Sequence, residues 1–318
     1  MRIVSLLPST TEILFAIGAG DDVVGVTFEC DYPVEAPTRR IVSTSAMPEG
    51  LTPVEIDAFV VNAMARGEDL YHLDKGALAW LDADLVVTQD LCAVCAVDVS
   101  VVDDALDYLG CTAEVLTIDP HTLDDVLESF VTLGRATGHL EEAERLVTGQ
   151  RRRLDVVRRR TERRLTAPRK TAPRKAGARK TGARKAARAQ TARRPRPRVM
   201  FLEWTEPPFA PGHWIPEMIS IAGGDAVLGT PGEKSRRVSW KDVQDTAPDV
   251  VVVGPCGFDR SGSQRLAEEL VASGNLPSGV PVHAVDANAS WARPGTRLPD
   301  GVEELAGLLA GLPAASSA

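Results

Sequence analysis

The sequence predicts an α/β protein of two lobes, each a mostly parallel doubly wound sheet with flanking helices, joined by a long linking helix. Short β-branched runs alternate with amphipathic stretches in both the first and the last third of the chain, as in parallel sheets wrapped by helices. A long helical pattern separates the two parts. The length of 318 residues, 44% of them hydrophobic, is enough for two cores of ordinary size.

The first lobe is expected over residues 1–137. Its predicted strands are residues 3–7, 23–26, 40–43, 85–88 and 115–118. Its predicted helices are residues 9–17, 53–65 and 101–109, with a helical turn over 70–82. Ser9 and Glu12 match a capping box at the start of the first helix. The near-continuous apolar run at 85–88 is typical of a central parallel strand.

The linking helix is expected over 138–165, after a break at Gly138, and the second lobe over 198–318. The strands of the second lobe are predicted at 199–202, 250–253 and 282–285, and its helices at 213–222, 263–272 and 299–309. Residues 166–197, by contrast, form a degenerate Thr-Ala-Pro-Arg-Lys repeat. This segment has too little apolar surface to offset the entropy of ordering, so we predict a basic, low-complexity, disordered insert.

Charge is distributed unevenly along the chain. Residues 151–198 carry 21 Lys and Arg against Asp155 and Glu162, whereas the whole protein has a net charge of −8. The basic insert could contact nucleic acid through phosphates alone. No aromatic side chain interleaves with it for base stacking, and a solvated tether accounts for it at least as well.

The sequence predicts a cytoplasmic protein without a membrane span. No apolar run reaches the roughly 18–20 residues that a membrane helix needs. The apolar stretch at 3–7 is shorter than the apolar region of a secretory signal and fits a buried strand. A start assigned too far downstream would make the protein extracytoplasmic instead.

The segments that follow the predicted strands are the candidates for a ligand site, because doubly wound sheets bind ligands beyond the carboxyl ends of their strands. Polar and aromatic residues gather there: Pro8, Ser9, Glu29, Asp31, Tyr32, Asp90, Trp204, Glu206, Phe209, His213, Trp214, Phe258, Trp291 and Arg293. Aromatic side chains on loops favour a flat, partly apolar ligand. The alternatives are core packing for the aromatics and an ordinary helix cap for Pro8 and Ser9.

Four of the five cysteines fall in the same segments, namely Cys30, Cys92, Cys95 and Cys256. They form a candidate thiolate-bound metal site, in which Cys256 or His213 would be the fourth ligand. A dithiol pair, or small apolar side chains filling tight turns, would explain them equally well.

The sequence contains few of the motifs that indicate an enzyme. The chain has no Gly-x-Ser-x-Gly elbow, no Walker loop and no Gly-x-Gly-x-x-Gly after its first strand. Glu203 and Glu206 are paired carboxylates without a nucleophile beside them. We therefore predict a binding protein that is not an enzyme.

The motifs resemble those of the cobalamin-binding, periplasmic-binding-protein-like family, which has the class III substrate-binding fold of ABC-type corrinoid and iron-siderophore uptake. The resemblance covers residues 2–165 and 198–311. It is carried by Ser-Leu-Leu-Pro-Ser-Thr-Thr-Glu at 5–12, Asp-Tyr-Pro at 31–33, Ala-Asp-Leu-Val-Val at 83–87, Pro-Pro-Phe at 207–209, Ala-Gly-Gly at 222–224, Val-Ser-Trp at 238–240 and Pro-Asp-Val at 248–250. The segments at 90–95 and 204–214 are similar to a branch without a signal peptide. The resemblance implies that Pro8, Tyr32, Phe209 and Trp240 line a corrin site, and that the loop with Trp291 and Arg293 closes over it.

Three departures from the family pattern argue against delivery to the membrane subunits of an ABC transporter. Lys241 stands near the place of an acidic residue in the second lobe, and in the first lobe only Asp74 is near, with 53–65 inserted. Gln89-Asp90 replaces a tryptophan after the central strand. We therefore expect a cytoplasmic carrier or sensor that binds cobalamin or a related corrinoid. A thiolate metal or redox protein, and a haem or siderophore binder, are the alternatives.

Overall fold

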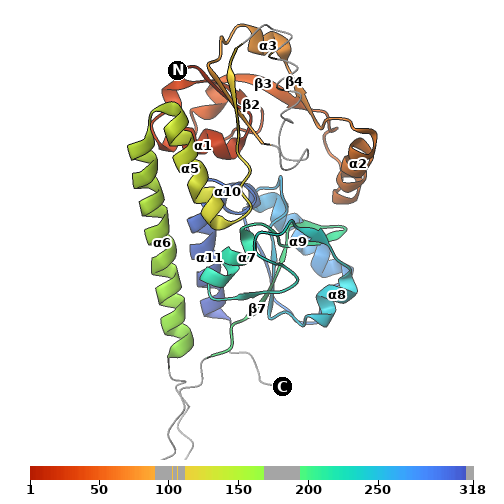
Figure 1. The fold of residues 1–318 in the computed structure, drawn as a ribbon. Helices are drawn as coiled ribbons and strands as arrows, with labels where there is room; N and C mark the ends of the chain where they lie inside the picture. The colour runs from red at the N-terminus through yellow and green to blue at the C-terminus, as the bar shows by residue number, and fades with distance from the viewer. Residues whose placement is uncertain (90–101, 103–105, 107–111, 168–193, 313–318) are drawn as a thin grey trace, which may run out of the picture.

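The computed structural model describes residues 1–89, 102, 106, 112–167 and 194–312. These residues form two lobes, and the long helix α6 (Leu140–Thr166) runs along both of them (Figure 1). The predicted fold class is confirmed, because each lobe has a mostly parallel sheet covered by helices.

The first lobe is built on a six-stranded sheet in the order β4-β3-β2-β1-β5-β6. All neighbours in it are parallel except β4, which runs antiparallel to β3. Its strands are β1 (Ile3–Ser5), β2 (Val23–Thr27), β3 (Arg40–Ser45), β4 (Tyr71–Leu73), β5 (Leu85–Thr88) and β6 (Glu114–Thr117). The fully buried β1 and β5 lie side by side at the centre, where the apolar run at 85–88 predicts a central strand.

The helices of this lobe are α1 (Pro8–Ala16), α2 (Pro53–Arg66), α3 (Lys75–Ala79) and α5 (Leu123–Thr137), and 3₁₀ turns lie at Gly20–Asp22 and Ala36–Thr38. The predicted capping box at Ser9 and Glu12 is wrong. The rigid ring of Pro8 occupies the first turn, Leu7 is the N-cap, and both predicted capping side chains are buried. A capping box does begin α2, where Thr52 and Glu55 bond reciprocally.

The helical turn predicted over 70–82 is also wrong in its first half. Tyr71–Leu73 is the edge strand β4, paired with β3, and only Lys75–Ala79 is helical. Pairing with a distant strand outweighs local helical propensity here. Most of the helix predicted over 101–109 falls outside the described residues. Val102 and Leu106 are its two described residues, and both are buried in the core of this lobe.

Helices α5 and α6 form an antiparallel hairpin, and the predicted break falls at Gly138, whose φ of +76° ends α5. The two helices cross closely at Gly134, where a Cβ atom would lie 2.5 Å from that of Ala143. Residues 168–193, most of the predicted insert, lie outside the described part of the chain.

The second lobe has a parallel four-stranded sheet in the order β10-β7-β12-β13 and a small antiparallel sheet in the order β11-β9-β8. The strands are β7 (Arg198–Leu202), β8 (Trp204–Thr205), β9 (Pro208–Ala210), β10 (Asp225–Ala226), β11 (Arg236–Arg237), β12 (Val250–Val253) and β13 (Val282–Ala284). The helices are α7 (Ile215–Ile221), α8 (Trp240–Asp245), α9 (Arg260–Ser273), α10 (Ala287–Ser290) and α11 (Leu298–Gly311). The small sheet, β10, α8 and α10 were not predicted.

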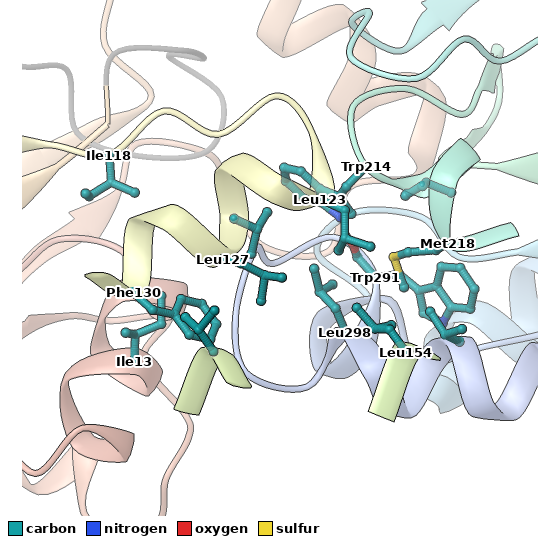
Figure 2. Close-up of a cluster of buried hydrophobic side chains, with 14 of the residues drawn as sticks. Ile13, Ile118, Leu123, Leu127, Phe130, Leu154, Trp214, Met218, Trp291 and Leu298 are labelled. Atoms are coloured by element: carbon teal, nitrogen blue, oxygen red, sulfur yellow. The ribbon is translucent and has the colours of Figure 1, made fainter. Parts of the chain in front are cut away.

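One apolar core runs through both lobes. In Figure 2, Leu123 and Leu127 of α5 lie between Ile13 of the first lobe and Trp214 and Trp291 of the second. Because the lobes share this core on the α5–α6 side, large rotations there would expose apolar surface. The lobe limits at 137 and 198 stay a prediction.

Within the residues that the structure describes, no helix combines the length and apolar character needed to span a membrane.

Candidate ligand-binding site

The segments after the parallel strands bring the two lobes together. The loops that follow β2 in the first lobe and β7 and β13 in the second make polar contacts with the other lobe. These contacts fall into two groups, one around Glu12 and one around α2. The predicted site residues are distributed between these groups and the core behind them.

The first group is an ion-pair network that joins α1 to the segment after α10. Arg297 binds the Glu12 carboxylate through both ends of its guanidinium, with Nη2–Oε1 at 2.5 Å and Nε–Oε2 at 3.1 Å. Arg293 binds the Asp31 carboxylate and donates to the carbonyl oxygen of Glu29 at 3.2 Å. The side chain of Glu12 is only 1% exposed, and its burial raises its pKa, an effect that the two arginines partly oppose.

Tyr32 and Phe28 present aromatic faces beside this network. Tyr32 is 45% exposed, and the Arg297 guanidinium lies 4.3 Å from its ring centre. The exposed ring of Phe28 lies 6.1 Å from that of Tyr71. The Tyr71 hydroxyl donates to Glu29 at 3.3 Å, and burial raises the pKa of Glu29. Sequence reasoning missed Tyr71, because its segment was assigned to a helical turn.

The second group joins the first turns of α2 to the second lobe. The indole N–H of Trp204 donates to the carbonyl oxygen of Pro53 at 3.2 Å. Arg237 on β11 binds both carboxylate oxygens of Asp57 at 2.7 and 3.0 Å, and its guanidinium lies 5.8 Å from the ring centre of Phe209. Helix α2 reaches from the first lobe toward the second, opposite α6 (Figure 1). It therefore bridges the lobes on the side away from the shared core.

Further candidates surround Trp204. The ring of Phe258 meets it edge-on at 5.8 Å, and Glu206 is exposed, with its carbonyl oxygen 3.1 Å from the Trp204 indole nitrogen. Trp240 is partly buried at the start of α8. Glu203 accepts a 2.6 Å hydrogen bond from the backbone of Gly212, and desolvation raises its pKa to about 7.

Four predicted residues lie in the interior. Trp291 is 0% exposed and packs 4.8 Å from the ring of Phe201. Trp214 is buried and donates its indole N–H to the carbonyl oxygen of Trp291 at 2.7 Å. Pro8 and Ser9 are buried in the first turn of α1. In this structure these side chains pack the protein and face no open surface.

His213 lies between the rings of His121 and Trp214, at 5.9 and 5.6 Å. Burial and the neighbouring His121 lower its pKa, so its ring is neutral at physiological pH. Its backbone has a φ of +49°, held by hydrogen bonds to Glu233 and Gly232.

Two of the four candidate thiolates are described. Cys30 is buried against the Thr11 hydroxyl at 3.1 Å, and burial raises its pKa to about 12, which disfavours the thiolate that metals bind. Cys256 is exposed. Cys92, Cys95 and Asp90 lie outside the described residues. Among the described ranges, no three His, Cys, Asp or Glu side chains are grouped to hold a metal.

The family pattern has one acidic residue on each lobe that faces the transporter. The residues near those two positions in this chain make contacts within their own lobes. Asp74 is the N-cap of α3 and accepts from the backbone of Ala77 at 2.9 Å. Lys241 is exposed and pairs with Asp245 one turn along α8.

No family model matches the chain. The chain is 24% identical over 293 residues to the vitamin B12-binding protein of Yersinia pestis (strain Pestoides F), covering 91% of this chain and 79% of the relative. It is also similar to the periplasmic vitamin B12 binding protein BtuF of Vibrio cholerae, with a TM-score of 0.58, 19% identity and coverage of 97% and 96%. The periplasmic heme-binding protein RhuT from Roseiflexus sp. RS-1 matches with a TM-score of 0.62, 20% identity and coverage of 97% of each chain.

These relatives confirm two predictions and correct a third. They support the resemblance to class III periplasmic binding proteins and a binding role without catalysis. The predicted cytoplasmic location is wrong. The solved neighbours are named as periplasmic proteins, which points to an extracytoplasmic location.

Proposed function

We propose, on the premise that this chain is a substrate-binding protein with the two-lobed class III periplasmic-binding-protein fold, that it binds cobalamin or a related corrinoid between its lobes. The observation that carries the proposal is the set of aromatic faces on both lobes, led by Tyr32 on the first and by Trp204 and Phe209 on the second. A corrin ring is large and flat, so it gains from aromatic faces above and below it. Its amide fringe suits donors and acceptors such as Asp31 and Glu206.

Each of the two polar contacts between the lobes has one of these aromatic side chains beside it. Arg297 of the Glu12 network lies over the ring of Tyr32, and Arg237 of the α2 contacts lies near the ring of Phe209. A ligand that enters between them must displace or reorder α2, because the opposite side is closed by the shared core. The relatives named as vitamin B12-binding proteins add weight to a corrinoid.

Haem is the second candidate, and Tyr32 favours it. A phenol oxygen is one of the axial ligands that proteins offer to haem iron. Tyr32 is exposed and lies beside the Arg297 guanidinium, which would also favour a ligand that carries carboxylates.

The test is an absorption titration of the folded protein with hydroxocobalamin, and separately with haemin. A saturable corrinoid shift near one equivalent is expected, and Phe209→Ala weakens the affinity about tenfold, the value of one aromatic contact. Trp80→Ala is the matched control, because Trp80 is an 86% exposed aromatic directly after α3. Saturation by haemin alone, lost in Tyr32→Phe, would assign the site to haem. No saturable shift with either ligand would remove the tetrapyrrole proposal.

A further inference from the structure

The C-terminal half of α6 carries a row of exposed arginines on one face. Arg152, Arg159 and Arg163 are spaced at i, i+7 and i+11, which places them within a narrow stripe about 17 Å long. Arg160 lies at its border. We call these four residues the arginine stripe. Val156 is 59% exposed between Arg152 and Arg159.

The stripe differs from the other arginines of the same helix segment in lacking acidic partners. Arg151 pairs with Asp124 at 3.5 Å, Arg158 with Asp155 at 2.7 Å, and Arg153 with two carboxylates of α11. The stripe arginines form no ion pair with any residue that the structure describes. The segment 168–193, which lies outside the description, contains no Asp or Glu and so adds no carboxylate.

Like charges also gather where α6 ends. Burial lowers the pKa of Arg164, and the charges of the nearby Arg194 and Arg160 add to the effect. Its Nη2 atom is buried without a hydrogen-bond partner among the described residues. That atom lies beside Gly223 of the second lobe, so Arg164 is not part of the exposed stripe. The next arginine, Arg196, is occupied by the carbonyl oxygens of Ser220 and Gly224.

This surface fits phosphate groups arranged on a plane. Arginine binds phosphate oxygens with two parallel donors, and several arginines in a row would meet several headgroups at once. The exposed Val156 adds an apolar contact in the middle of the stripe. Helix α6 and residues 167–198 contain no aromatic side chain for base stacking, and the relatives are periplasmic, both of which favour a bilayer over a nucleic acid.

We infer that the arginine stripe, with the exposed Arg194 beyond its end, is a docking surface for the anionic phospholipid headgroups of a membrane. This role goes beyond ligand binding and does not depend on which ligand the cleft takes. Helix α6 lies on the side of the molecule opposite α2 (Figure 1). Docking through α6 therefore leaves the α2 side of the cleft free.

The test is co-sedimentation of the full chain with vesicles of phosphatidylcholine containing 30 mol% phosphatidylglycerol, and with pure phosphatidylcholine. Binding to the anionic vesicles alone is expected, weakening as salt is raised. The variant Arg152→Gln/Arg159→Gln/Arg163→Gln should lose roughly tenfold or more of this affinity, since each cation near an anionic surface contributes. These side chains are exposed, so its melting temperature should match that of the wild type.

The matched control removes three positive charges elsewhere, as Arg40→Gln/Arg135→Gln/Arg265→Gln, all exposed positions outside α6. It should keep its affinity within about threefold, since total charge acts weakly beyond the screening distance. Equal losses in the two variants would show that only net charge matters and would overturn the inference. Failure to bind anionic vesicles would also overturn it, as would tighter binding of the wild type to double-stranded DNA than to these vesicles.

Discussion

Glu12→Gln should be among the most destabilising conservative substitutions on the surface between the lobes. The carboxylate is 1% exposed and accepts two hydrogen bonds from Arg297. The Nη1 atom of Arg293 lies 3.9 Å from its Oε1 atom. Glutamine keeps the shape of the side chain and removes its charge. The Arg297 guanidinium would then lie in a largely buried position without its counterion.

The structure sets the size of this effect. Removing one partner of a buried ion pair costs about 3–5 kcal/mol, because the remaining charge is left uncompensated. The Arg297 side chain keeps 20% of its surface exposed and stacks on Tyr32, so it recovers some hydration. We therefore expect the lower end, about 3 kcal/mol of unfolding free energy. Glu303→Gln is the matched control. This substitution breaks the ion pair between Arg153 of α6 and Glu303 of α11, whose carboxylate side chain is 46% exposed. It should lower the free energy of unfolding by only about 0–1 kcal/mol.

Urea unfolding at pH 7, followed by circular dichroism, measures both variants against the wild type. The double variant Glu12→Gln/Arg297→Met should regain part of the loss, because it leaves no unpaired charge. If Glu12→Gln costs less than about 1 kcal/mol, or no more than Glu303→Gln, the network does not join the lobes as argued.

Three further predictions follow from single contacts. Because the pKa of Glu203 is raised to about 7, the folded state binds more protons than the unfolded state between about pH 4.5 and 7, so stability falls as pH rises through this window. In Glu203→Gln, the difference between the unfolding free energies measured in urea at pH 5 and at pH 8 should be smaller than in the wild type. An unchanged difference would contradict the raised pKa of Glu203. Trp291→Ala should cost about 3–5 kcal/mol in the same assay, since the side chain is fully buried, and a loss near zero would mean that it is not core. Asp57→Asn should speed amide hydrogen exchange in the first turns of α2 several-fold by releasing Arg237, whereas Glu68→Gln, whose pair with Arg66 stays within one lobe, should not.

Much of the fold follows from local pattern. The runs at 85–88 and 250–253 are buried strands in the structure, and Gly138 ends a helix where the sequence predicts a break. These features depend on periodicity, on β-branched side chains and on the freedom of glycine, all of which act over a few residues. The resemblance to cobalamin-binding proteins also rests on short segments that are read directly.

The two errors in the predicted elements of the first lobe share one cause. Ser9 and Glu12 have the spacing of a cap, yet Glu12 is held by Arg297, 285 positions along the chain. The strand at Tyr71–Leu73 exists because β3 pairs with it, and its local pattern gives no sign of that pairing. Local propensity predicts an element poorly where contacts with a distant part of the chain stabilise the structure more than the local cap or turn would.

The sequence by itself determined the class of fold, the order of most elements, the segments that meet at the strand ends and the family resemblance. Only the tertiary structure decided which of those side chains are free to touch a ligand. Trp291 and Tyr32 follow strands in the same way, but one is enclosed by the core that both lobes share and the other is exposed beside Arg297. Exposure depends on the surfaces that pack together from far along the chain, and no local pattern encodes them.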